Sequence, residues 1–190
     1  MVGGVYWRSE PTDPGINAVS TGLFASLAAE LAFIHSNSTY AKQAAISLEW
    51  IDNMLLQPNG LVADHIDGAC TLTDWLFTYN QGLYIRAYAR LGSLSFAPNA
   101  TQMAKATTAA YYAMNTTLWN NAQGLITGTF RYRNTFALIS LRTLEDTGPT
   151  LGDDDGIGFK SVMIRALSGL HTLTQDAQVQ ADILRYINLQ

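Results

Sequence analysis

Charged residues are scarce in this sequence, since only 14% of its 190 residues are Asp, Glu, Lys or Arg, against about 25% in ordinary globular chains. The net charge is −4 and no basic cluster is present, which argues against a nucleic-acid partner. No apolar run approaches the roughly 20 residues that a membrane span needs, so we expect no transmembrane segment. The low charge predicts either a neutral polar surface or a surface that further protein normally covers.

Cysteine is almost absent, and Cys70 is the single one in the chain. One thiol forms no intramolecular disulfide, so Cys70 is either a buried thiol of an intracellular protein or a cysteine whose partner lies elsewhere. The first residues do not form a signal peptide. Because residues 1–7 have the composition of a loop interior, we expect an N-terminally truncated portion of a longer protein.

Hydrophobic residues are plentiful, at 48% of the chain, which suffices for a single domain over residues 1–190. Apolar residues recur at spacings of three and four, which predicts helices. We expect six helices, over residues 14–34, 39–55, 78–91, 99–114, 155–173 and 175–187. A short strand is expected at 124–130, and residues 135–144 fit either a strand or a helix.

Two of these helices carry capping signals. Asp13 followed by Pro14 predicts the start of the first helix, and Thr78 with Gln81 fits a capping box at the start of the third. The larger apolar residues of the first helix form one face, and small residues line much of the remainder, so we expect this helix to be buried on several sides. The larger residues are Val19, Leu23, Leu27, Leu31 and Ile34.

The six helices form three consecutive pairs, which predicts an all-α fold: a partial α/α toroid of about three helical hairpins. In such a fold inner and outer helices alternate, and the loops at one end of the inner helices form a groove. Helical repeats bury their faces only against neighbouring repeats. A piece of a ring with three pairs therefore leaves two open faces.

Four segments occur in the order and spacing typical of glycoside hydrolase family 76, the endo-α-1,6-mannanases. Gly-Gly-Val-Tyr-Trp at 3–7 resembles a Gly-Gly-aliphatic-Trp loop, and residues 17–27 resemble the Asn-containing start of an inner helix. Thr-Tyr-Asn-Gln-Gly at 78–82 is the most specific match. Asp-Asp-Asp at 153–155, followed by Phe159 and Lys160, resembles an acidic turn before a Phe-Lys helix start.

The resemblance implies a glycoside hydrolase that acts on α-1,6-mannan, either a retaining endo-mannanase or a cell-wall mannan transglycosylase, with no cofactor. The family's catalytic residues are two adjacent aspartates that precede the Gly-Gly-Val-Tyr-Trp loop. No such pair precedes Gly3 in this sequence, so we assign no catalytic residue and leave the activity of this chain open. The alternatives are a non-catalytic carbohydrate-binding or degenerate toroid domain, a toroid enzyme for another glycan or a terpene, and a helical scaffold without a ligand.

The resemblance also indicates which residues contact sugar. Amides hydrogen-bond sugar hydroxyls, and aromatic rings pack against pyranose faces. We expect substrate contacts from Trp7, Asn17, Tyr79, Asn80, Gln81, Asp154, Phe159 and Lys160. Structural roles are the alternative at each position: core rings for Trp7 and Trp75, helix capping and core packing at 79–81, and charge neutralisation of the acidic turn by Lys160.

The acidic residues fit more than one role. The run at 153–155 suits a helix N-terminal cap, hydrogen bonding to substrate, or the carboxyl pair of a retaining glycosidase, which stands roughly 5 Å apart. Calcium binding is not expected, because EF-hand acids alternate instead of adjoining. Asp64, His65 and Asp67 suggest a metal site, but no second His or Cys cluster accompanies them, so we expect a solvated loop.

Three Asn-x-Ser/Thr sequons, at Asn37, Asn99 and Asn115, predict N-glycosylation near helix ends. Helix capping by the same asparagines is the alternative. With the resemblance, the sequons predict a secreted or cell-wall-associated protein whose partners are mannan or mannoprotein glycans. The sequence carries no signal for an oligomeric state.

Overall fold

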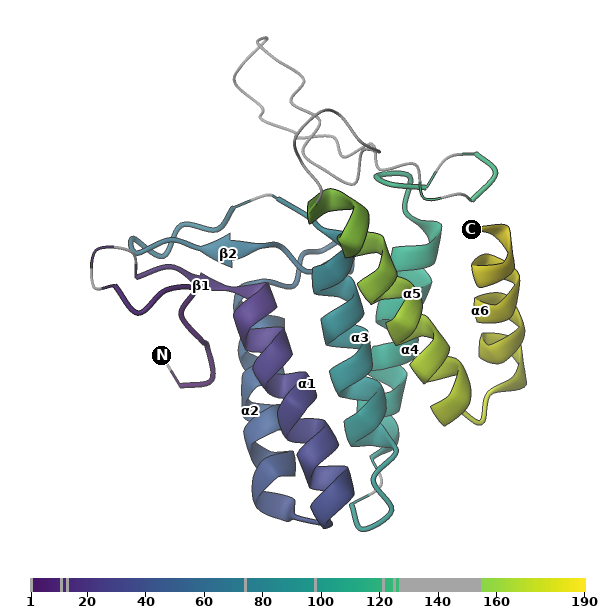
Figure 1. Ribbon diagram of the computed structural model, residues 1–190, viewed down its shortest axis with the longest axis horizontal. Coiled ribbons are helices and arrows are strands. Elements are labelled where there is room, and N and C mark those ends of the chain that lie inside the picture. The colour runs from purple at the N-terminus through teal and green to yellow at the C-terminus, as the bar shows by residue number, and fades with distance from the viewer. Residues whose placement is uncertain are drawn as a thin grey trace, which may run out of the picture.

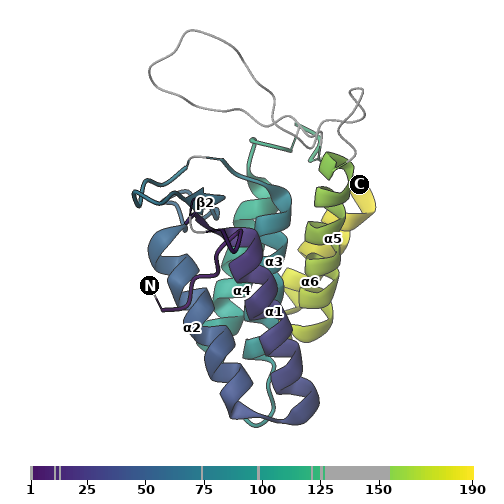
Figure 2. The same cartoon turned by 60° about the vertical axis from the view of Figure 1, so that its left-hand side comes forward.

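Three helical hairpins stand side by side in the computed structural model, which describes residues 2–10, 12, 14–73, 75–97, 99–120, 122–124, 126 and 155–190. The pairs are α1 (Ala18–His35) with α2 (Ser38–Met54), α3 (Thr78–Gly92) with α4 (Ala100–Asn115), and α5 (Asp155–Leu173) with α6 (Ala177–Leu189). Figures 1 and 2 show α1, α3 and α5 in one layer and α2, α4 and α6 in a second. This alternation is the arrangement of the predicted partial α/α toroid.

The helix α3 lies at the centre, where it packs against α1, α2, α4 and α5. Its predicted inner face is buried, at Leu83, Ala87 and Leu91. The predicted stripe of the second helix is buried as well, at Ala44, Leu48, Ile51 and Leu55. Periodicity therefore located the core correctly in these two helices.

The helix α1 begins at Ala18, four residues later than the predicted start at Pro14. Asn17 is its N-cap, because the Asn17 Oδ1 accepts a hydrogen bond from the Ser20 backbone N–H at 3.0 Å. A side-chain oxygen at this position satisfies one of the first unpaired N–H groups of a helix. Asp13, the predicted cap, lies outside the described residues.

The prediction that α1 is buried on several sides is wrong for the side that carries its large apolar residues. Leu23, Leu27 and Ile34 are 55%, 60% and 66% exposed. The buried side consists of small residues, namely Ala18, Thr21, Gly22, Ala25, Ser26, Ala28, Ala29 and Ala32. These allow α2 and α3 to approach closely: a Cβ added at Gly22 would lie 2.9 Å from the Leu83 Cβ.

The expectation of no apolar run long enough for a membrane is also revised. Among the described helices, α1 has the length and the apolar composition of a membrane span, and 44% of it is buried inside the structure. The alanines of α1 pack against neighbouring helices, so core packing accounts for part of this composition. The exposed large residues, among them Leu23, Leu27 and Ile34, supply the rest.

A short antiparallel ladder, absent from the sequence prediction, precedes α1. Strand β1 (Ile16–Asn17) pairs with β2 (His65–Ile66), with Ile16 opposite Ile66 and Asn17 opposite His65. Of the strand predicted at 124–130, Ile126 forms an isolated bridge with Asn120. Residues 127–130 and 135–144 lie outside the described part.

The capping box predicted at the start of the third helix is not formed. Phe77 occupies the N-cap position of α3 without a side-chain capping bond. Gln81 turns instead toward the preceding loop: its Nε2 donates to the carbonyls of Val62 and Phe77, and its Oε1 accepts from the Val62 N–H at 2.8 Å. The amide thus fixes the loop against the first turn of α3.

Candidate functional site

The candidate site lies where the first turns of the layer α1, α3 and α5 meet, beside β1 and β2 (Figure 1). Its centre is Asp64, which is only 8% exposed. The Asp64 Oδ1 accepts hydrogen bonds from the Tyr79 hydroxyl at 3.2 Å and from the Asn80 Nδ2 at 3.0 Å. The Oδ2 lies 2.9 Å from the His65 Nδ1. One carboxylate therefore holds three polar side chains in place.

The main chain of Asp64 joins the same elements. Its carbonyl accepts a hydrogen bond from the Ala18 N–H at 2.7 Å, and its own N–H donates to the Trp75 carbonyl at 2.8 Å. Ala18 is the first residue of α1, while Tyr79 and Asn80 lie in the first turn of α3. Asp64 therefore connects the starts of two inner helices.

Five aromatic rings surround this carboxylate. Tyr79 stacks on Phe77 with centroids 5.2 Å apart, and the Phe159 ring from α5 lies 4.3 Å from the ring of Tyr79. Trp75 meets His65 edge-on at 6.0 Å. We call the group the Asp64 cluster; it consists of Asp64, His65, Trp75, Phe77, Tyr79, Asn80 and Phe159. It combines half-buried aromatic surface with polar groups, as sugar-binding sites do.

Trp7 is connected to this cluster indirectly, through strand β1. Its N–H donates to the Gly15 carbonyl at 3.1 Å, and the neighbouring Tyr6 forms a bridge with Ile16 in β1. Trp7 is 54% exposed and lines a cavity of about 580 Å³ in the N-terminal loop. Trp7 and Tyr79 are thus linked through β1 and β2.

The remaining predicted contact residues differ in accessibility. Asn17 is 8% exposed and caps α1, while Gln81 is 2% exposed and saturated by the loop. Both positions serve to place the site's backbone. Lys160 follows Phe159 on α5 and is half-buried. Asp154 lies outside the described residues.

Sequence reasoning missed the role of Asp64 and His65. They were expected in a solvated loop, and this expectation is wrong for Asp64, which is buried. Asp67 does lie exposed, and its Oδ1 accepts the N–H groups of Ala69 and Thr71. The available signal was that Asp64 follows the apolar run 61–63, which places it at the edge of the core.

Metal chemistry has no support in the described part of the chain. No group of three or more His, Cys, Asp or Glu side chains there is placed to hold an ion. The His65 Nδ1 lies 2.9 Å from the Asp64 Oδ2 and 3.4 Å from the Thr73 Oγ1. The Asp64 cluster is therefore built for hydrogen bonding and ring stacking.

Solved structures with the same helical arrangement define the class of protein, an α/α toroid. One of them is an α-1,6-mannanase of Salegentibacter sp. HEL1_6, an inactive variant with two aspartates replaced, in complex with α-1,6-mannotetrose. It superimposes with a TM-score of 0.75 and 22% identity, over 96% of this chain and 48% of its own length. An α-mannanase of Bacteroides thetaiotaomicron gives 0.67 and 14%, over 97% and 44%. A cellobiose 2-epimerase of Bacillus thermoamylovorans gives 0.65 and 14%, over 99% and 47%.

The chain belongs to glycosyl hydrolase family 76, whose family model matches residues 1–189. A mannan endo-1,6-alpha-mannosidase homologue of Schizosaccharomyces pombe is 35% identical over 96 residues, which are 46% of this chain and 21% of that protein. The chain thus spans about half the length of the solved relatives, and about a fifth of the yeast protein is matched.

Proposed function

We propose that this chain forms the substrate-binding part of a glycoside hydrolase that acts on α-1,6-mannan. The observation that carries the proposal is the Asp64 cluster. It places a carboxylate, an amide and an imidazole among aromatic rings at the first turns of the inner helices. The Salegentibacter relative, described in complex with α-1,6-mannotetrose, supports this choice of glycan.

Within the cluster, the rings and the polar groups have separate roles. Tyr79 and Phe159 offer half-buried rings for the apolar face of a mannose unit. The Asn80 Oδ1 is buried and faces no hydrogen-bond donor in the described part of the chain. Buried acceptors are nearly always paired, so we propose that a sugar hydroxyl or a bridging water supplies the missing donor.

Hydrolysis needs a carboxyl pair in addition. A retaining glycosidase uses a nucleophile and an acid/base roughly 5 Å apart. Both oxygens of Asp64 are engaged by neighbouring side chains, which suits a positioning role. We propose that the reacting carboxyls lie outside the described residues. The relative that is inactive after replacement of two aspartates supports such a pair.

Two finer assignments belong to the same proposal. We place the protein in the secretory pathway or cell wall, where mannan and mannoproteins are its partners. We also propose that the reaction is hydrolysis and not transfer of the sugar to a second glycan. A non-catalytic mannan-binding domain is the second candidate, favoured by the absence of a carboxyl pair at the Asp64 cluster among the described side chains.

Titration of the full chain with α-1,6-mannotetraose, followed by calorimetry and by product chromatography, tests the proposal. We expect binding that weakens about 5- to 150-fold in Asn80→Ala and Tyr79→Ala, as loss of a buried hydrogen bond or a stacked ring costs about 1–3 kcal/mol. Tyr40→Ala, at a 38% exposed ring on the outer helix α2, is the control. Equal affinity for a β-1,4-linked glucose tetramer would refute the mannan assignment, and mannose release would reject the non-catalytic candidate.

A further inference from the structure

The three sequons differ in their structural context. Asn37 and Asn99 each cap a helix through Oδ1, which accepts the N–H of Thr39 and of Gln102, respectively. Their sequons continue directly into α2 and α4. Asn115 is instead the last residue of α4, and Thr116 after it is extended, with φ −69° and ψ 141°. Asn115 therefore presents its sequon on chain that leaves the helix.

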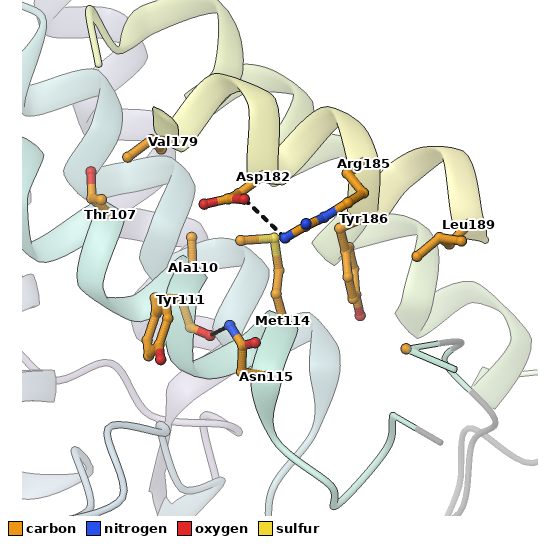
Figure 3. Close-up of a pocket in the computed structure, with 11 residues that line it drawn as sticks. Thr107, Ala110, Tyr111, Met114, Asn115, Val179, Asp182, Arg185, Tyr186 and Leu189 are labelled. Atoms are coloured by element: carbon orange, nitrogen blue, oxygen red, sulfur yellow. Dashed lines mark hydrogen bonds and ion pairs between the residues drawn. The ribbon is translucent and has the colours of Figure 1, made fainter. Parts of the chain in front are cut away.

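A cleft of about 280 Å³ lies beside Asn115, between the outer helices α4 and α6 (Figure 3). Its volume is close to the lower limit for small-molecule sites, roughly 300 Å³. Ala110, Met114 and Val179 provide its apolar lining. Both helices belong to the outer layer, whereas the Asp64 cluster lies at the first turns of the inner helices.

The groups around this cleft suit a sugar ring. Tyr111 lies one turn before Asn115 and is 61% exposed, so it offers a ring face close to the Asn115 amide. Asp182 and Arg185 form an ion pair at 3.0 Å on the opposite wall, and Figure 3 shows this pair facing Met114 across the cleft. Sugars bind where an aromatic face and charged hydrogen-bonding groups meet.

We propose that Asn115 is N-glycosylated and that the first sugar of this glycan packs in the α4/α6 cleft against Tyr111. The Asn115 Nδ2 attacks C1 of an oligosaccharide linked to a lipid diphosphate. The N–C1 bond forms, the C1–O bond breaks, the lipid diphosphate leaves with the electron pair, and one Nδ2 proton passes to a base of the transferase.

The fold accommodates this product. The Asn115 Nδ2 donates to the Tyr111 carbonyl at 2.8 Å, and the glycosylated amide keeps one N–H for that bond. Asn115 itself is exposed. The inference rests on the proposed secretory location and not on mannan binding, so the two proposals fail independently.

Sequon use is measured by translating the chain behind a cleavable signal peptide in the presence of microsomes, so that it enters the lumen where glycans are transferred. We expect Asn115 to carry a glycan removable by endoglycosidase and mapped by peptide mass spectrometry. Thr117→Ala removes the sequon and abolishes this glycan, whereas the matched control Thr116→Ala retains it. An Asn115 peptide that stays unmodified in the microsomal product overturns the proposal.

Docking of the first sugar is measured on secreted protein by thermal unfolding before and after treatment with a peptide N-glycosidase, which removes the glycan together with its first sugar. Loss of the glycan is expected to lower the melting temperature by about 2–4 °C, the shift typical of one modest interaction in a chain of this size. In Tyr111→Ala the same treatment leaves the melting temperature unchanged. An equal decrease in both proteins overturns the docking of the sugar on Tyr111.

Discussion

At the scale of single residues, Asp64 matters most because its two carboxylate oxygens serve three neighbouring side chains. Tyr79 and Asn80 donate to one oxygen, and His65 lies against the other. Such a network stabilises the fold only when each member is paired, since an unpaired buried polar group lowers the free energy of unfolding. The geometry of Tyr79 and Asn80 therefore depends on a residue that lies outside α3, in the segment between α2 and α3.

Replacement of Asp64 by Asn tests this dependence. The amide places an N–H₂ group where the carboxylate accepted hydrogen bonds, so we expect the free energy of unfolding to fall by about 1–3 kcal/mol. Urea unfolding followed by circular dichroism measures the change. Asp67→Asn is the control, because Asp67 is exposed and its side-chain oxygen is retained in the variant; a change within about 0.5 kcal/mol is expected. Equal losses in the two variants would contradict the role of Asp64.

The sequence predicted part of this site. The Thr-Tyr-Asn-Gln-Gly motif pointed to Tyr79 and Asn80, and the Phe-Lys motif pointed to Phe159, which the structure brings within 4.3 Å of Tyr79. Asp64 was assigned to a solvated loop, because spacing along the chain does not reveal that β2 pairs with β1 and brings this loop onto α3. Local sequence patterns do not reveal contacts between segments that are distant along the chain.

At the scale of helices, glycine sets the distance between α3 and α5. A Cβ added at Gly82 would lie 2.8 Å from the Met163 Cα and 2.9 Å from its N, which are backbone atoms that cannot rotate away. At Gly169 of α5, an added Cβ meets no atom within 4 Å. The two glycines thus form a matched pair in helices of the same layer.

Alanine at these two positions is expected to have opposite effects. Gly82→Ala separates α3 from α5 and costs about 1–3 kcal/mol, as overpacking does. Gly169→Ala gains about 0.5–1 kcal/mol, because alanine restricts the unfolded chain and favours the helix. Thermal unfolding of the two variants measures the difference, and a stabilised Gly82→Ala protein would show that the helices separate freely.

A polar network joins three helices on the opposite side of α3. The hydroxyls of Tyr84 and Tyr88 each donate at 2.6 Å to one oxygen of Asp52 in α2, and Lys105 of α4 contacts the same carboxylate. Burial, followed by the hydrogen bond to Asp52, raises the pKa of both tyrosines well above the ordinary 10.0. Both therefore remain neutral in the folded state at a pH where free tyrosine ionises.

This network predicts a loss of stability in alkali. Below pH 10.0, the ordinary tyrosine pKa, both tyrosines are protonated in the folded and in the unfolded state, and the network contributes fully to stability. Above it, the unfolded chain ionises first, so the free energy of unfolding falls as the pH rises. Urea unfolding from neutral pH to about pH 11 should give a shallower decline in Tyr88→Phe than in the parent. Tyr111→Phe, at an exposed ring, should retain the parental slope; an unchanged slope in Tyr88→Phe would contradict the assignment.

Periodicity predicted the existence and order of the helices and failed on the orientation of α1. The spacing of Leu23, Leu27 and Ile34 is typical of a core stripe, yet these side chains are exposed. The alanines and Gly22 of α1 do not stand out as a hydrophobic stripe in the sequence, although they form its tightly packed side. Helix α2 was predicted correctly because its large residues and its buried residues coincide.

At the scale of the whole molecule, α1 leaves one side with large apolar residues exposed, among them Leu23, Leu27 and Ile34. The chain spans 48% of the Salegentibacter relative, and exposed leucines that share one helix side form a surface suited to further packing. Leu27→Asn is expected to reduce binding of a hydrophobic dye while changing the free energy of unfolding by less than about 0.5 kcal/mol.

The matched core variant Leu48→Ala should behave differently. Leu48 is fully buried in α2, so its truncation is expected to cost about 2–5 kcal/mol without lowering dye binding. Fluorescence titration and urea unfolding separate the two outcomes. A strongly destabilised Leu27→Asn protein would show that α1 buries its large residues after all.

The position of α3 sets a gradient in hydrogen-exchange protection. Four helices surround α3, so its amides can exchange with solvent only when most of the molecule opens. Helix α6 packs mainly on α5 and can detach while the rest persists. Deuterium should therefore enter α6 first and the buried turn around Ile85 last, which would make α6 a separately opening unit.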